Sequence, residues 1–188
     1  MEHEVLSGGF QNAPIDAARA FRAAMSAMAR PGRIETLSGA RPPHPLSIAG
    51  GTLLLTLCDP ETPVHLAGDH DVSDIRAWIA FHTGAPLVAR EVASFAVGTW
   101  DALLPLGDYR LGVPEYPDRS ATLIVERSVL ADGGAALTGP GICTSAALDL
   151  PEIEAFRSNA RHFPLGLDFF FTAGDRAAAL PRTTKVTA

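Results

Sequence analysis

Lysine is almost absent from this chain of 188 residues, because 14 of its 15 basic residues are Arg and Lys185 is the single Lys. A Walker A phosphate loop needs a Gly-Lys pair at the start of a helix, and a pyridoxal phosphate enzyme needs an internal Lys for its Schiff base. Since Lys185 lies close to the C-terminus, we expect neither mechanism. The Arg bias can reflect the coding preference of the genome, although Arg is also the better bidentate partner for phosphate.

Positive charge and cysteine are scarce as well. The formal net charge is −6 and no two Arg residues are adjacent, whereas a general nucleic-acid binder needs a basic stripe that displaces counterions. The two cysteines, Cys58 and Cys143, lie far apart without a Cys-x-x-Cys spacing, so the sequence predicts neither a disulfide framework nor a zinc knuckle. We therefore expect a protein of the reduced cytoplasm that does not bind nucleic acid.

Long apolar runs are also missing, since none approaches the roughly 20 residues that a membrane-spanning helix needs. The first residues, Met1–Glu4, are acidic and lead into Ser7-Gly8-Gly9, without the basic segment and apolar stretch of a signal peptide. The length is typical of one domain, and a composition that is 47% hydrophobic supplies a sizeable core without disulfides or metal. We expect a single cytoplasmic domain over residues 1–188, not associated with a membrane.

Four segments have the features of helices. Residues 14–30 place apolar side chains at intervals of three and four, which predicts an amphipathic surface helix whose apolar face consists of Ile15, Ala18, Phe21, Met25 and Met28. Residues 46–57 are almost continuously apolar, so helix and buried strand compete, and the length of the run favours a buried helix. Residues 74–83 form a third helix, with Asp71 or Ser73 as its N-cap and Gly84 at its C-terminus, and residues 151–161 form the last.

Strands alternate with these helices. They are predicted at residues 33–37, 63–67, 94–97, 121–125, 135–138, 167–172 and 177–180. The β-branched run 121–125 is expected at the centre of a sheet, Asp132-Gly133-Gly134 is expected to be a hairpin turn, and residues 99–119 are expected to be irregular. The pattern predicts an α/β fold, with a mixed sheet and helices on its faces.

Few residues point to chemistry. Residues 137–142 follow a strand and contain two glycines, so their amides either cradle an anion or form an ordinary turn. His82, in the last turn of a helix, either faces a pocket or simply ends the helix. Residues 181–185 place Arg182 and two hydroxyls after a strand, where they either hold phosphate oxygens or form a solvated tail.

Two further histidine groups have alternative explanations. His65 and His70, with Asp69 and Asp71, offer metal-ligand atoms, but a surface loop explains them better and we expect no metal site. The pair Arg161-His162 lies at a helix end, where it stabilises the terminal carbonyls without any ligand. No Ser-His-Asp order, Gly-x-Ser-x-Gly elbow or His-Glu-x-x-His motif is present, so we expect no catalytic residue set.

A series of short strings nevertheless resembles one known family over nearly the whole chain. The strings are, in order, Met25 with Pro31-Gly32; residues 53–57 followed by Asp59 and Thr62-Pro63-Val64; Phe81-His82-Thr83 with residues 85–88; residues 121–124; Leu137-Thr138-Gly139 with Gly141-Ile142; residues 163–166 with Asp168; and residues 181–184. Together they resemble the PhnH subunit family of the bacterial carbon-phosphorus lyase system, which degrades organophosphonates.

The resemblance implies a function and partners. Members act with the G, I and L subunits in making α-D-ribose 1-methylphosphonate 5-triphosphate from a purine nucleoside triphosphate and methylphosphonate. They form homodimers and join a cytoplasmic core complex with the G, I and J subunits. The family fold, three αβα layers with a mixed sheet, is similar to the large domain of pyridoxal-phosphate transferases but holds no cofactor, which agrees with the lone Lys185.

The resemblance leaves the role of this subunit open. No nucleophile or acid-base motif can be transferred, and His82, Arg182 and Thr183 are the residues of the family strings that we expect to bind phosphonate or triphosphate. His65, His70 and residues 99–119 lie outside those strings. The first hypothesis is a subunit of a multi-subunit transferase, the second is a non-catalytic docking subunit of the same complex, and an independent small-molecule enzyme is the third.

Overall fold

The computed structural model describes residues 7–188, so the acidic start at Met1–Glu4 lies outside the described residues. A six-stranded sheet has the order β1-β10-β9-β6-β3-β2. Its strands are β1 (Glu35–Thr36), β2 (Val64–Leu66), β3 (Phe95–Thr99), β6 (Thr122–Glu126), β9 (Asp168–Ala173) and β10 (Arg176–Leu180). Strands β2, β3, β6 and β9 are parallel, β10 runs antiparallel to β9, and β1 pairs antiparallel with β10, which confirms the mixed sheet.

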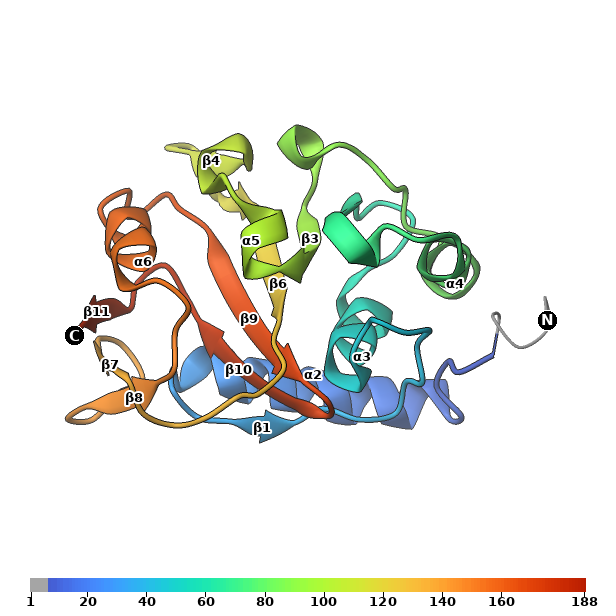
Figure 1. Ribbon diagram of the computed structural model, residues 1–188, viewed down its shortest axis with the longest axis horizontal. Coiled ribbons are helices and arrows are strands. Elements are labelled where there is room, and N and C mark those ends of the chain that lie inside the picture. Colours follow the sequence, from blue (N-terminus) through green and yellow to red (C-terminus); the bar gives the residue numbers. More distant parts are fainter. Residues whose placement is uncertain (1–6) are drawn as a thin grey trace.

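The central strands are buried on both faces of the sheet. In β6, the side chains of Leu123, Ile124 and Val125 are fully buried, as its predicted central position requires. Because successive side chains point to opposite faces, Ile124 and Phe170 join one hydrophobic core while Leu123 and Phe169 join the other. Helices contribute to both cores, and in Figure 1 α5 lies in front of the sheet while α2 passes behind β10.

Helix α2 (Ala13–Ala29) matches the predicted range, but it buries a different face from the apolar one. Its buried residues are Ala20, Ala24 and Ala27, whereas Ile15, Phe21 and Met25 are 48%, 47% and 55% exposed. The helix packs against α3 and β10, whose small residues allow a close approach that only an alanine face can make. Ile15, Phe21 and Met25 therefore form a stripe on the surface, the α2 stripe, whereas Met28 of the predicted apolar face packs against the core.

Helix α3 (Ile48–Leu57) confirms the buried helix predicted for the long apolar run. The Ser47 hydroxyl accepts a hydrogen bond from the Gly50 amide and so caps the first turn. Two glycines give the helix room, since a Cβ on Gly51 would lie 2.6 Å from Pro42 Cγ.

Helix α4 (Ser73–Thr83) has the predicted range, but the predicted N-cap is wrong. Val72 occupies that position without a side-chain cap, and the Asp71 carboxylate pairs instead with Arg76. Gly84 ends the helix in the left-handed region, with φ of 69°, as predicted. The extended segment after it bonds to the edge of β2 through Val64 and Val88.

The other face carries α5 (Trp100–Leu103), α6 (Ile153–Ala160) and the three-stranded sheet β11-β7-β8. The strands of this small sheet are β7 (Ala135–Thr138), β8 (Ala146–Leu148) and β11 (Lys185–Thr187). Because β7 pairs with β8 and β11 rather than with β6, the turn predicted at residues 132–134 does not close a hairpin with the preceding strand. Residues 99–119 are also more ordered than predicted, since they include α5 and the hairpin of β4 (Leu111–Val113) with β5 (Tyr116–Ser120).

Within residues 7–188, none of the helices combines the length and apolar character that crossing a membrane requires.

Candidate functional site

The Arg182 guanidinium forms its hydrogen bonds with other groups of the protein. Nε lies 3.1 Å from Asp168 Oδ1, Nη1 donates to Pro117 O at 2.6 Å, and Nη2 donates both to Asp168 Oδ2 and to Ser120 Oγ. The Arg182 backbone amide also donates to Asp168 Oδ1, at 2.8 Å. The arrangement ties the segment after β10 to the start of β9 and to the β5 strand, which favours a structural role for this side chain.

His82 lies far from Arg182. Its ring packs against Trp78 and Phe81, with ring centroids 5.0 and 4.9 Å away, and a Cβ on Gly9 would lie 2.6 Å from its Cε1. Helix α4 and the segment that follows β10 stand at opposite ends of the view in Figure 1. The structure therefore does not bring His82 together with Arg182, or with its half-buried neighbour Thr183.

The two histidines between α3 and α4, His65 and His70, do not assemble a metal site. His65 Nδ1 lies 3.0 Å from Val88 O, which can only accept, so Nδ1 carries the proton of the neutral ring. His70 is buried rather than on a surface loop, and this burial lowers its pKa, against the opposing effect of Asp69. Among residues 7–188, no group of three or more potential ligands is placed to hold a metal ion.

The glycine loop at residues 137–142 is packed as a turn. Gly141 has a φ of +81°, and a Cβ there would lie 1.9 Å from the carbonyl oxygen of Ala29. A carbonyl oxygen so close to the loop backbone repels an anion. Between the two alternatives left by the sequence, the geometry favours the ordinary turn.

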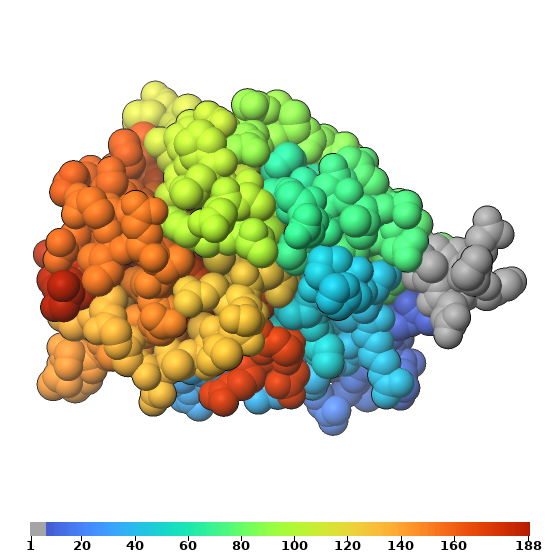
Figure 2. Space-filling model, in the orientation of Figure 1, coloured from blue at the N-terminus to red at the C-terminus, as the bar shows by residue number. Residues whose placement is uncertain are grey.

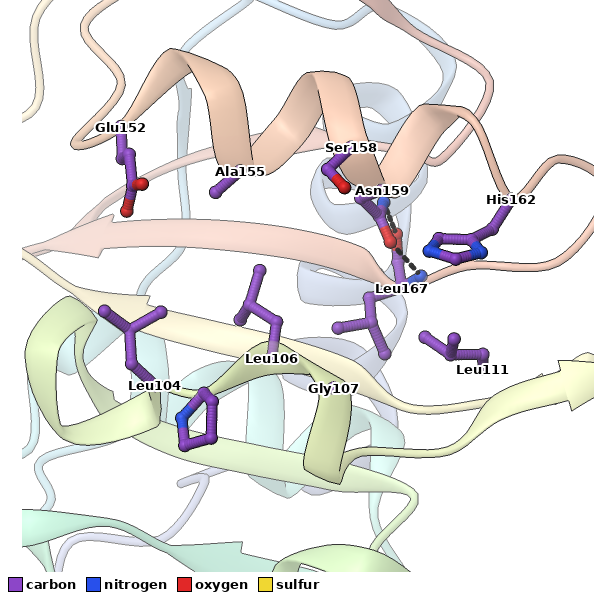
Figure 3. Close-up of a pocket in the computed structure, with 11 residues that line it drawn as sticks. Leu104, Leu106, Gly107, Leu111, Glu152, Ala155, Ser158, Asn159, His162 and Leu167 are labelled. Atoms are coloured by element: carbon purple, nitrogen blue, oxygen red, sulfur yellow. Dashed lines mark hydrogen bonds between the residues drawn. The ribbon is translucent and has the colours of Figure 1, made fainter.

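One cavity has the features of a small-molecule site. It has a volume of about 420 Å³ and lies between α6 and the segment that joins α5 to β4 (Figure 3). We call it the α6 groove, and its lining consists of Leu104, Pro105, Leu106, Gly107, Leu111, Glu152, Ala155, Ser158, Asn159, His162 and Leu167. Its size is within the range of ligand pockets, which begins at roughly 300 Å³.

Helix α6 positions one wall of the groove. Glu152, Ala155, Ser158 and His162 recur at intervals of three and four, so they follow one face of the helix and its flanks. Asn159 anchors this helix, because its side chain accepts from Leu167 N and donates to Leu167 O, both at 2.8 Å (Figure 3). The opposite wall is apolar and consists mainly of the leucines that follow α5.

The polar side chains of the α6 groove are at its solvent-exposed margin. Glu152 Oε2 accepts from Trp100 Nε1 at 3.3 Å, and the Glu152 and Ser158 side chains are otherwise exposed to solvent. No Lys or Arg belongs to the lining, within the described part of the chain. Such a groove suits the uncharged, hydrogen-bonding part of a ligand rather than its phosphates. Sequence reasoning identified His162 only as a helix-end residue, although the spacing along 152–162 is a pattern that could have indicated the face.

A buried acid lies elsewhere, at the carboxyl end of β6. Glu126 Oε1 accepts from the Ser47 amide at 3.1 Å and from the Ser47 hydroxyl at 2.9 Å, beside the first turn of α3. Burial raises the pKa of Glu126 to about 7, although the two hydrogen bonds from Ser47 act in the opposite direction. The sequence did not indicate this residue, because a Glu at the end of a strand is ordinarily solvated.

Comparison with known proteins identifies a matching family and two relatives. A family model described as "Bacterial phosphonate metabolism protein (PhnH)" matches residues 8–187. The chain is 40% identical over 195 residues to the α-D-ribose 1-methylphosphonate 5-triphosphate synthase subunit PhnH of Rhizobium meliloti (strain 1021), covering 98% of this chain and 97% of that protein. It is 32% identical over 174 residues to the putative C-P lyase subunit protein HtxG of Stutzerimonas stutzeri, covering 89% and 84% respectively.

Proposed function

Because the chain belongs to the PhnH family of bacterial phosphonate metabolism proteins, we propose that it is a subunit of a carbon-phosphorus lyase core complex that acts in the α-D-ribose 1-methylphosphonate 5-triphosphate synthase step. The observation that carries this proposal is the 40% identity to the Rhizobium meliloti subunit over almost the full length of both chains. The proposal assigns the activity to the assembly rather than to this chain alone.

The chemistry of this step defines what the assembly must bind. The bond between ribose C1 and the purine base of a nucleoside triphosphate breaks, a bond between C1 and an oxygen of methylphosphonate forms, and the base leaves. A net charge of −6 repels the triphosphate, so cations must be gathered locally or supplied by partner subunits. We include in this proposal the transferase activity, a cytoplasmic location, a homodimer, and the G, I and J subunits as partners, with L functionally linked.

Growth on methylphosphonate tests the proposal. A bacterium that lacks its own PhnH gene is expected to grow on methylphosphonate as sole phosphorus source when this chain is supplied together with the G, I and J subunits of the same source. Growth on inorganic phosphate is the control, because it does not need the pathway. Failure to restore growth, with the chain expressed and copurifying, would contradict the proposed step.

The α2 stripe favours the second candidate function, a docking subunit of the same complex. Ile15, Phe21 and Met25 are about half exposed on one helix, and clustered apolar side chains of this size on a surface mark interaction sites. An area that is apolar in the isolated chain is expected to be covered by a partner subunit. The two functions are compatible, because a subunit can dock through α2 and contribute to the synthase step elsewhere.

The double variant Phe21→Arg/Met25→Arg tests docking. Two charges on the α2 stripe are expected to reduce copurification with the other subunits at least tenfold and to abolish growth on methylphosphonate. Its thermal midpoint should match that of the unmodified chain, because both side chains are exposed. Val129→Arg, at a residue 66% exposed outside the stripe, is the matched control. Normal copurification of the double variant would exclude this surface.

The relation to pyridoxal-phosphate transferases is also a proposal. It is supported by the mixed six-stranded sheet and by helices that contribute to cores on both of its faces. Lys185 lies exposed in β11, at the margin of the small sheet, which is unlike the internal position that a Schiff base needs.

A further inference from the structure

We propose that Glu126 is a proton-transfer residue of the synthase step, in which Oε2 of its carboxyl gives a proton to the departing base. This inference rests on the proposed function, in which a nucleoside triphosphate loses its base. It adds a catalytic role for this subunit and places that role at the carboxyl end of β6.

Glu126 lies at the edge of the sheet where α/β proteins usually bind ligands. It is the last residue of β6, which lies between the parallel strands β3 and β9. Ligands of open α/β sheets bind outside the carboxyl ends of such strands. Glu126 keeps 8% exposure there, and in Figure 2 the gold segment that follows β6 borders the cyan loop before α3. The carboxyl is therefore close to the surface but largely removed from water.

The N-terminus of α3 holds one oxygen of this carboxyl in place. Oε1 accepts from the amide and the hydroxyl of Ser47, and that hydroxyl accepts from the Gly50 amide at 2.9 Å. A Cβ on Gly50 would lie 2.2 Å from Oε1, so the helix and the carboxyl are in close contact. Because both hydrogen bonds go to Oε1, Oε2 is the oxygen that can exchange a proton.

The surroundings of Glu126 support both of its protonation states. Burial favours the neutral carboxyl, whereas Ser47 and the hydroxyl of Thr172, its neighbour on β9, favour the carboxylate. No Lys, Arg or His within residues 7–188 forms an ion pair with Glu126. The resulting pKa of about 7 leaves both forms populated at neutral pH, as a general acid or base requires.

A structural role alone does not explain a carboxyl at this position. Gln has nearly the same shape, and its amide oxygen can accept the same two hydrogen bonds from Ser47 without burying a charge. Glu126 therefore lowers the stability of the chain at pH 8 relative to Gln, and groups that lower stability are common where activity needs them. The property that Glu has and Gln lacks is an exchangeable proton.

The proposed step moves one proton. An oxygen of methylphosphonate bonds to ribose C1, and the electron pair of the bond between C1 and the base stays on a nitrogen of the base. The O–H bond of Glu126 breaks and an N–H bond forms on that nitrogen. The carboxylate, held by Ser47, recovers a proton from the solvent before the next turnover.

Carbon NMR of the full chain, labelled with carbon-13 at the glutamate carboxyls, tests the protonation state directly. One resonance is expected to titrate with a midpoint near pH 7, and it should be absent from Glu126→Gln. If every glutamate titrates at an ordinary acidic pH, Glu126 is not a proton donor at neutral pH and the proposal is overturned.

The rate at which the copurified assembly, with the L subunit, releases adenine from ATP in the presence of methylphosphonate tests the role. Glu126→Gln is expected to lower this rate at least about 100-fold, the lower end for general acid catalysis, while copurification is unchanged and the thermal midpoint at pH 8 rises. The unmodified assembly should become slower above about pH 7, as the carboxyl loses its proton, and this decline should be absent from the variant.

Glu126→Asp separates proton transfer from helix capping. Asp keeps an exchangeable proton but is one methylene shorter, so it weakens the contact with Ser47. It is expected to be faster but less stable than Glu126→Gln, whereas a purely structural role predicts the opposite order of rates. Asp101→Asn is the matched control, at an exposed acid in the first turn of α5 after the neighbouring strand β3, and its rate should stay within twofold.

The outcomes separate this inference from the proposed function. An unmodified assembly that releases no adenine would overturn the proposed function and this inference together. An active assembly whose Glu126→Gln variant is equally fast would overturn only the inference. If Glu126→Gln instead prevents copurification, the carboxyl is a contact with a partner subunit and the proton-transfer role is excluded.

Discussion

Replacing Glu126 with Gln is expected to raise the free energy of unfolding by about 3 kcal/mol at pH 8 and by less than about 1 kcal/mol at pH 5. The magnitude follows from the pKa of the native carboxyl, about 7 against an ordinary value of 4.5, at about 1.4 kcal/mol for each pH unit. Burial is the physical cause, because the charged form loses its hydration when the chain folds.

The direction of this pH dependence follows from the number of protons that Glu126 binds in the native and the unfolded chain. Between pH 4.5 and about 7 the native Glu126 holds a proton that the unfolded chain has released, so unfolding releases protons and stability falls as pH rises. Below pH 4.5 both states are protonated and the cost disappears. Gln is neutral at every pH, so the variant should lack this part of the pH dependence.

Urea unfolding at pH 5 and pH 8 measures the effect. Glu115→Gln, at an exposed acid in the turn between β4 and β5, is the control and should follow the unmodified chain at both values. A variant that is equally destabilised at both pH values would show that the Ser47 hydrogen bonds, rather than the buried charge, determine the contribution of Glu126.

Arg182→Ala is expected to lower the free energy of unfolding by about 3 kcal/mol, the range for breaking a largely buried ion pair. The Arg182 and Asp168 side chains are only 12% and 21% exposed, and the substitution leaves the Asp168 carboxylate without its cation. It also removes the donors to Pro117 O and Ser120 Oγ. The loss should appear in urea unfolding and as a lower thermal midpoint.

A double-mutant cycle with Asp168→Ala checks the cause. Removing both charges is expected to cost clearly less than the sum of the single substitutions, since no unpaired charge is then left behind. Arg176→Ala, at an exposed Arg in β10 without an ion pair among the described residues, should change stability by less than about 0.5 kcal/mol. Additive single effects would contradict the ion-pair explanation.

This prediction changes how a growth assay at Arg182 is interpreted. Loss of growth on methylphosphonate in Arg182→Ala would reflect reduced folding unless the protein level is shown to be normal. Substrate binding by His82, Arg182 and Thr183 stays a prediction, although the packing of Arg182 favours a role in holding β9 and the C-terminal segment together.

The fold was largely predictable where a segment interacts mainly with the core as a whole. The run at residues 46–57 is long and apolar, and it is the buried helix α3; the β-branched run at 121–125 is a central strand. Gly84 ends α4 because only glycine adopts its left-handed conformation readily. The single domain over residues 1–188 stays a prediction.

The features that were wrong or missed depend on partners distant in sequence. Apolar spacing identified α2 as a helix, but the packing of its alanines against α3 and β10 decided that Phe21 and Met25 face solvent. The strand at residues 135–138 is not part of the main sheet, because it pairs with β8 and β11. No local pattern carries that information, since strand pairing is a long-range contact.

The scarcity of Lys, the negative charge and the ordered family strings were sufficient to exclude several chemistries and to identify the family, because these are properties of the residues themselves. Tertiary structure alone decided which groups are available for binding. It joined Arg182 to Asp168 across 14 residues of sequence, buried Glu126 beside Ser47, and opened a groove between α6 and the leucines after α5. Availability depends on which atoms a side chain meets after folding, and those atoms come from elsewhere in the chain.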